Sequence, residues 1–160
     1  MHGIALMLKQ ASIQQVWAQE IPRQNSVIVI AMCFYPRGVK KEWRDDYKKE
    51  LAPDRELFRE WKEAEKLHGH VEAFVHSKYE ERFQLSWLGE QYLKYYCNES
   101  RTKDVYLVCQ CKLGEKCHRE MLMLHGKIKY AAEIDKVFND YAVYLARISG
   151  SDGAIELVAD

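Results

Sequence analysis

The residues of this sequence that could do chemistry are concentrated in one short stretch. It contains Cys109, Cys111, Cys117, His118 and Arg119. The stretch follows an apolar run, 105–108, that predicts a buried strand, and Cys117 with His118 opens a predicted helix. Open α/β sheets bind their ligands where a strand ends and the next helix begins. We therefore expect a functional site at this corner of the fold.

The first chemistry that fits these residues is the binding of a small anion. The N–H groups and the dipole of a helix N-terminus favour phosphate or carboxylate. Arg119 lies in the first turn of the predicted helix, Lys112 lies in the loop before it, and Arg37 follows the end of another predicted strand. We predict that Arg37, Arg119 and Lys112 bind a small anionic or nucleotide-like ligand, although both arginines could instead pair with helix carboxylates.

The second chemistry is that of a reactive thiol. A cysteine at a helix N-terminus beside a histidine and an arginine is expected to form a thiolate readily. In this hypothesis Cys117 is the catalytic nucleophile, His118 is its base or proton carrier, and Cys111 is a resolving thiol. The alternative is that the cysteines are small buried residues without a chemical role. Whether the protein is an enzyme stays open.

The third chemistry is metal binding. Cys109, Cys111, Cys117 and His118 are ligand types that suit zinc or iron. Their spacing, C-x-C-x5-C-H, is not a standard zinc pattern, and an adjacent cysteine and histidine rarely reach the same ion. If such a cofactor is bound, the protein could be a non-catalytic interaction module that holds zinc or iron.

The elements that must position these residues can be predicted from apolar periodicity. Strands are expected at 4–9, 27–34 and 105–108, with a further edge strand at 154–158. Segment 12–19 is either a helix or a packed loop. Helices are expected at 40–51, at 55–67, over 71–96 with a break at Gly89, from Cys117 to a stop at His125 and Gly126, and at 130–149. The run YAVYLARIS, at 141–149, could instead form a strand.

This order of elements predicts a single α/β domain over residues 1–160. Parallel strands need crossover helices, so the fold should be a small, mainly parallel sheet flanked by helices. A helical insertion is expected between the second and third strands, over the carboxyl edge of the sheet. Residues 127–160 are expected to form a C-terminal helical extension. The oligomeric state is not predicted.

Composition excludes several classes of function. The chain has 160 residues, 24 basic and 24 acidic, so its net charge of zero argues against a broad nucleic-acid surface. No apolar run is long enough to cross a membrane, and the first residues do not resemble a signal peptide. Five cysteines, three of them clustered, favour reduced thiols in a cytoplasmic protein over a disulfide framework.

Two parts of the sequence resemble a known family, the domain-of-unknown-function family 488, which includes the YeaO-like proteins. The first is FYPRGVKK followed by YKKELAPDREL, at 34–41 and 47–57. The second is VYLVCQCKLGEKCHREML at 105–122, where Cys109, Cys117, His118 and Arg119 keep the spacing of the family. The resemblance covers about residues 4–125. It implies a fold and the location of a site, and no reaction.

This sequence departs from the family at two places. The family often has an aspartate and an arginine just before the proline-arginine turn, where this chain has Met32 and Cys33. An acid–base role for that aspartate is therefore absent here. The family also often has a glutamate two positions after the first cysteine of the strand, where this chain has Cys111.

Overall fold

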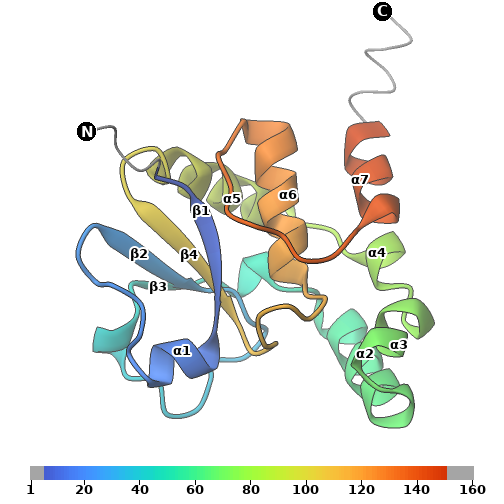
Figure 1. Cartoon of the computed structure of the whole chain (residues 1–160). Helices are drawn as coiled ribbons and strands as arrows, with labels where there is room; N and C mark the ends of the chain where they lie inside the picture. Colours follow the sequence, from blue (N-terminus) through green and yellow to red (C-terminus); the bar gives the residue numbers. More distant parts are fainter. Residues whose placement is uncertain (1–5, 151–160) are drawn as a thin grey trace, which may run out of the picture.

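The computed structural model of the protein describes residues 6–150. Its centre is a parallel sheet of four strands in the order β1-β4-β2-β3. The strands are β1 (Leu8–Ser12), β2 (Ser26–Ile30), β3 (Asp46–Tyr47) and β4 (Asp104–Cys109). Because all four strands run in the same direction, their carboxyl ends meet at one edge (Figure 1). The expected small parallel α/β fold is thereby confirmed.

Nine helical segments surround this sheet in the described part of the chain. They are α1 (Ile13–Trp17), the 3₁₀ helices η1 (Lys41–Trp43) and η2 (Lys49–Leu51), α2 (Arg55–His68), α3 (His70–His76), α4 (Tyr79–Arg82), α5 (Trp87–Glu99), α6 (His118–Tyr130) and α7 (Ala142–Ser149). Figure 1 shows α2 and α3 beyond the carboxyl edge of the sheet, where the helical insertion is expected, while α5 and α6 cover a face.

Alternating residues of the central strands feed two separate hydrophobic clusters. Val105 and Leu107 of β4 join the larger cluster, which they share with α2, α5, α6 and α7. Val108 joins the smaller cluster, which contains Ile13 and Val16 of α1. The two-residue period of a strand sends successive side chains to opposite faces. The sheet is therefore covered on both sides, as its continuous apolar strands predict.

The helix predicted at 40–51 is wrong. This segment forms η1, the edge strand β3 and η2. Trp43 and Tyr47 pack against the smaller cluster, whereas Leu51 is buried in the larger one on the other face of the sheet. The spacing i, i+4, i+8 therefore does not describe one helical stripe, and the chain crosses the sheet edge instead.

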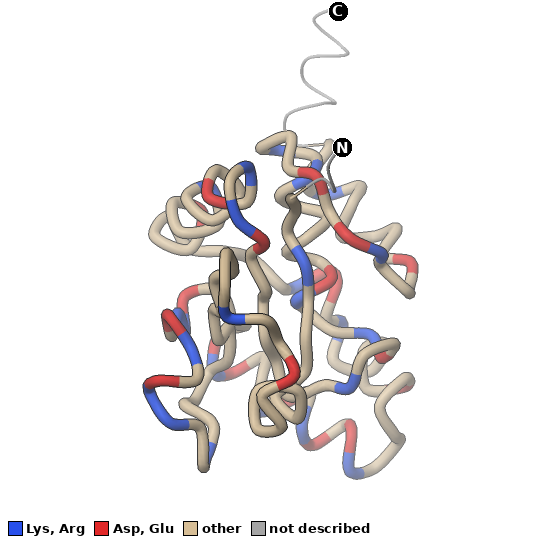
Figure 2. The backbone as a smooth tube through the Cα atoms, turned by 60° about the vertical axis from the view of Figure 1, so that its left-hand side comes forward, with Lys and Arg blue, Asp and Glu red and all other residues tan. Residues whose placement is uncertain are grey.

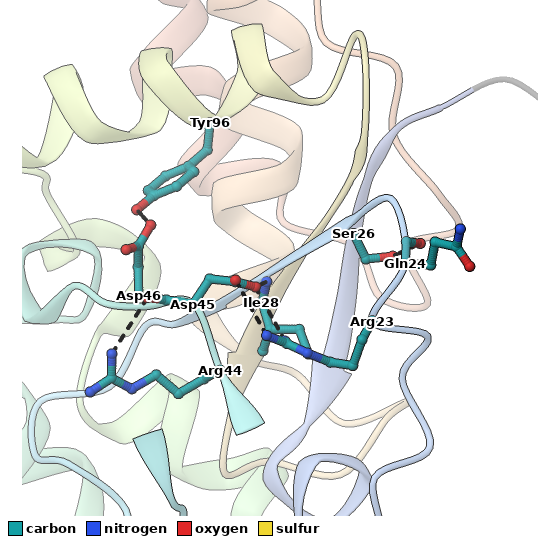
Figure 3. A network of polar contacts seen from close by, with 8 residues as sticks. All are labelled: Arg23, Gln24, Ser26, Ile28, Arg44, Asp45, Asp46 and Tyr96. Carbon is teal, nitrogen blue, oxygen red and sulfur yellow. Dashed lines mark hydrogen bonds and ion pairs between the residues drawn. The ribbon is translucent and has the colours of Figure 1, made fainter. Parts of the chain in front are cut away.

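Two aspartates fix this edge strand (Figure 3). The Asp45 carboxylate accepts a hydrogen bond from the Ile28 amide at 2.8 Å and also pairs with Arg23. The Asp46 carboxylate accepts from the Tyr96 hydroxyl of α5 at 2.5 Å. These bonds join a two-residue strand both to its neighbour β2 and to a helix that covers the sheet.

The predicted break at Gly89 is also wrong. Gly89 lies inside α5, and its amide donates to the hydroxyl of Ser86, the N-cap of that helix, at 3.0 Å. The interruptions in 71–96 occur instead at Ser77–Lys78 and between α4 and α5. Lys78 has a positive φ of 54°, a conformation that ends a helix for most side chains.

The C-terminal part differs from its prediction as well. Helix α6 continues through His125 and Gly126 to Tyr130. A Cβ at Gly126 would lie 2.6 Å from Cys97 Sγ, so the glycine permits close packing inside the helix instead of ending it. Residues 131–141 are then irregular, and Ile134 forms a parallel bridge to Leu8 of β1. Only 142–149 is helical. The edge strand predicted at 154–158 lies outside the described residues.

The strand boundaries also shift. The first strand begins later than predicted, and the second ends at Ile30 rather than at residue 34. Segment 12–19 contains the short helix α1. Figure 2 shows basic and acidic residues interspersed along the described chain. Among the described helices, none combines the length and the apolar character that a membrane crossing requires.

Candidate functional site

The structure brings three of the five cysteines together at the carboxyl edge of the sheet. The Sγ atoms of Cys109, Cys111 and Cys117 all lie within 4.8 Å of one another. Cys109 ends β4, Cys111 lies in the following turn, and Cys117 is the N-cap of α6. We call these three residues the sulfur cluster. These three residues lie close together because the strand, the turn and the helix that carry them follow one another directly in the sequence.

His118 completes this group. Its Nδ1 lies 3.7 Å from Cys117 Sγ and 3.8 Å from Cys109 Sγ. Its Nε2 lies 2.7 Å from the main-chain oxygen of Ala31, just after β2. A carbonyl oxygen can only accept, so Nε2 carries the proton and donates. The ring is thereby fixed with Nδ1 toward the sulfurs.

The side chains of Cys117 and His118 lie on the same side of the chain and approach each other to 3.7 Å. This was not expected of two adjacent residues. Cys117 has the extended dihedral angles φ −159° and ψ 150°, and the helix begins at the next residue. The chain direction therefore changes between the two side chains. The amide of Cys117 is also bonded, to the Tyr141 hydroxyl at 3.0 Å. This amide is consequently not free to bind an anion.

Arg119 is placed differently from the other members of the motif. Its side chain is completely buried, and it is not among the residues that line the nearby cavity. Its guanidinium donates to the carbonyl oxygens of Cys111 at 2.7 Å and Lys112 at 3.0 Å, and to Gln10 Oε1 at 2.6 Å. A longer bond of 3.4 Å reaches the carbonyl of Cys109. Arg119 therefore holds the backbone that carries two of the sulfurs.

A cavity of about 550 Å³ opens above the sulfur cluster. Segments that follow β1, β2 and β4 line it, together with α2 and α3. Its aromatic lining consists of Trp17, Phe34, Tyr35, Phe58, Trp61, Phe74 and Tyr79. Arg37 and Lys112, two of the three predicted ligand-binding residues, also line it. All three cysteines of the cluster and His118 are part of this lining.

The cluster has unusual electrostatics. Hydrogen bonds from the other two thiols lower the pKa of Cys109, although its burial acts in the opposite direction, and the nearby His118 lowers it further. The bonds to its two sulfur neighbours raise the pKa of Cys111. Burial lowers the pKa of His118, but the negative sulfurs of Cys109 and Cys117 outweigh it and raise that pKa to about 10. Without other ligands, a thiolate and an imidazolium therefore face each other.

Sequence reasoning missed two groups on this cavity. Cys33 lines it, and burial raises the pKa of this thiol to about 11. His70 also lines the cavity, and its ring lies between the Glu65 carboxylate at 2.9 Å and the Lys116 carbonyl at 2.7 Å. Both residues come from segments far from the motif. In the sequence, only their residue types, a cysteine and a histidine, could have indicated a functional role.

Trp61 shows an unsatisfied polar group. It is more than nine-tenths buried and lines the cavity. Its indole N–H has no hydrogen-bond partner among the described residues. Buried donors are normally paired, so such a group calls for a partner outside the chain.

A parallel sheet with a lined cavity at its carboxyl edge defines the class: an α/β protein that binds a ligand where its strands end. Within this class, the chain belongs to the family DUF488-N3a, whose model is described as the active DUF488-N3 subclade and matches residues 12–125. The YeaO-like proteins are part of the same DUF488 family. Comparisons with curated proteins and with solved structures find no match.

Proposed function

We propose that the protein is a small-molecule enzyme that binds a planar anionic ligand in the cavity and acts on it with the sulfur cluster. One observation carries this proposal. The sulfur cluster and His118 lie on the wall of a cavity at the carboxyl edge of a parallel sheet. Reactive groups that face a ligand-sized space at this edge are the usual arrangement of an active site.

The lining favours a flat ligand. Seven aromatic side chains contribute to it, and rings stack or meet edge to face with other rings. A volume of about 550 Å³ is within the range of small-molecule sites. The unpaired N–H of Trp61 adds a donor for an acceptor atom of the ligand. A heteroaromatic ring such as a nucleobase has both the face and the acceptors.

The charged residues of the cavity favour an anionic group on that ligand. Arg37, Lys62 and Lys112 line it, against the two carboxylates of Glu65 and Glu115. Glu65 already pairs with His70, and Glu115 accepts from the Lys112 amide at 2.8 Å. Arg37, Lys62 and Lys112 would therefore bind the anionic group of the ligand, a role that the sequence analysis gave in part to Arg119.

The proposed roles within the motif follow from these positions. Cys117 and His118 remain the proposed catalytic groups, joined by Cys109 and Cys111. Arg119 becomes a positioning residue, since its guanidinium holds carbonyls and does not line the cavity. The description of the matched family as an active subclade supports a working site.

Thermal unfolding of the full chain with nucleoside monophosphates tests the proposal. A ligand at about one hundred times its Kd should raise Tm by roughly 5–10 °C. The double variant Arg37→Ala/Lys112→Ala should lose most of this shift, because it removes two cations of the cavity. Lys127→Ala, an exposed residue of α6, is the matched control and should keep it.

The same samples report on the position of the ligand. Bound ligand should slow the alkylation by iodoacetamide of Cys111, the partly exposed thiol of the cluster, in protein dialysed against a chelator. The proposal fails if planar anions leave both Tm and alkylation unchanged, or if the double variant responds as Lys127→Ala does.

A further inference from the structure

The sulfur cluster has the geometry of a metal site. Ligand atoms around a tetrahedral zinc ion are about 3.8 Å apart, given Zn–S distances of about 2.3 Å. The three Sγ atoms lie within 4.8 Å of one another, and His118 Nδ1 lies 3.7 and 3.8 Å from two of them. His118 is not in the group of ligand atoms that all lie within 4.8 Å of one another, so binding by all four residues requires Cys111 Sγ and His118 Nδ1 to move closer together around the ion.

We propose that Cys109, Cys111, Cys117 and His118 Nδ1 bind one Zn²⁺ ion at the floor of the cavity. Thiolates and imidazole are the ligands that this borderline-soft ion prefers. The proposal goes beyond the proposed function, and the two describe different states of the cluster. With the ion bound, the three thiolates and the His118 imidazole are all occupied as ligands. The thiol chemistry of the proposed function therefore belongs to the metal-free protein.

The orientation of His118 supports this proposal independently. Histidines that ligate metals normally donate their other ring N–H to a carbonyl or carboxylate, which fixes the tautomer. His118 does so through Nε2, which donates to the Ala31 carbonyl at 2.7 Å. Nδ1 is then directed at the sulfurs, and it can ligate the ion once it has lost its proton. On binding, the ion takes the place of protons on the cluster, and these protons are released to solvent.

The backbone around the sulfurs is held in place without the ion. Arg119 binds the carbonyl of Cys111 at 2.7 Å and that of Lys112 at 3.0 Å. The Tyr141 hydroxyl accepts from the Cys117 amide at 3.0 Å. Cys109 is at the end of a central strand. Such support orients ligands before the metal arrives, as the outer contacts of metal sites do.

A second group of potential ligands, His70, Cys111 and Glu115, is less suitable. Their ligand atoms also lie within 4.8 Å of one another. Both ring nitrogens of His70 are already bonded, to Glu65 at 2.9 Å and to the Lys116 carbonyl at 2.7 Å. Cys111 is common to both groups. We place the ion at the sulfur cluster, because His118 Nδ1 faces the sulfurs there whereas neither ring nitrogen of His70 is free.

Metal analysis and cobalt substitution of the full chain test the proposal. Reduced protein loaded with zinc and then desalted should retain one ion per chain. Titration with Co²⁺ should produce sulfur-to-cobalt charge-transfer bands and the visible bands of a tetrahedral site, which saturate at one equivalent. Cys111→Ser should weaken cobalt binding at least tenfold, and Arg119→Lys roughly tenfold through the lost carbonyl contacts.

Cys33→Ser is the matched control, since Cys33 lines the same cavity but is not a member of the cluster. It should bind cobalt as the unmodified protein does. A protection experiment needs no variant: zinc should shield Cys111, the partly exposed thiol of the cluster, from alkylation under native conditions while Cys33 is labelled at an unchanged rate.

The proposal is overturned if cobalt gives no charge-transfer band at one equivalent, or if Cys111→Ser and Cys33→Ser bind it equally. Zinc protection that fails to distinguish Cys33 from the cluster would also overturn it. Ligand-induced thermal shifts are measured on chelator-dialysed protein, so their presence or absence decides the proposed function separately.

Discussion

Arg119 shows how residue type and residue role can separate. An arginine beside a cysteine and a histidine at a helix start suggests an anchor for an anionic substrate. The structure buries its guanidinium completely and bonds it to Gln10 and to the carbonyls of Cys111 and Lys112. A planar group with five donors can satisfy several carbonyls of a tight loop at once, which lysine cannot do.

The first prediction concerns the stability that Arg119 contributes. Arg119→Ala should lower the free energy of unfolding by about 3 kcal/mol or more, because a fully buried side chain is removed and the oxygens of Gln10, Cys111 and Lys112 lose their donor. Arg119→Lys should lose less, since one ammonium can still reach an acceptor. Urea unfolding followed by circular dichroism measures both. Arg59→Ala, whose side chain is 60% exposed on α2, should leave stability unchanged. A loss below about 1 kcal/mol for Arg119→Ala would contradict this assignment.

At the scale of the elements, Gly89 shows why a glycine need not break a helix. A Cβ at this position would lie 2.6 Å from the main-chain oxygen of Glu50, the middle residue of η2. The glycine therefore allows α5 to approach the 3₁₀ turn closely. Glycine was read from the sequence as a helix breaker, whereas here it permits packing between two elements.

The second prediction follows from this contact. Gly89→Ala should destabilise the protein by about 1–3 kcal/mol, because backbone cannot yield as a flexible side chain does. On helix propensity alone, the same change should stabilise it by about 1 kcal/mol. Gly150→Ala is the control, since nothing lies within 4 Å of its added Cβ. Stability of Gly89→Ala equal to or above that of the unmodified chain would refute the close contact.

At the scale of the whole molecule, residues 131–149 are part of the main core. Tyr141, Tyr144 and Ile148 belong to the larger hydrophobic cluster. The Tyr144 hydroxyl lies 2.8 Å from His125 Nδ1, and His125 Nε2 lies 3.0 Å from the Glu90 carboxylate. This chain of contacts joins α5, α6 and α7.

The third prediction is a pH dependence that originates at Glu90. Burial raises the pKa of this carboxyl, but hydrogen bonds from His125 and Tyr130 outweigh it, and the net shift is downward. A folded pKa below the unfolded value means that the unfolded state binds more protons. The contribution of Glu90 to stability is therefore present above about pH 4.3, the unfolded value, and lost as pH falls through the folded pKa.

Glu90→Gln should consequently be less stable than the unmodified chain near pH 7, and this difference should shrink as the pH falls below about 4.3. Urea unfolding at a series of pH values between 3 and 7 measures it. Glu81→Gln, an exposed residue of α4, should parallel the unmodified chain throughout. A difference for Glu90→Gln that is constant with pH would show that the ionised carboxylate is not the cause.

The sequence by itself determined the central features of this protein. The apolar runs around Val29 and Leu107 predicted buried parallel strands, because a strand covered on both faces has no polar side. The order of strand, loop and helix start also placed Cys109, Cys111, Cys117 and His118 at one corner. These are local properties, set by a few neighbouring residues.

Only the tertiary structure decided what distant segments do to one another. Trp43, Tyr47 and Leu51 have helical spacing, yet they lie on two faces of the sheet. His70, Cys33 and Trp61 reach the cavity from segments remote from the motif. Arg119 is held among carbonyls, because folding of the loop brings them around it. Local periodicity carries no information on such contacts, since they depend on how whole elements pack.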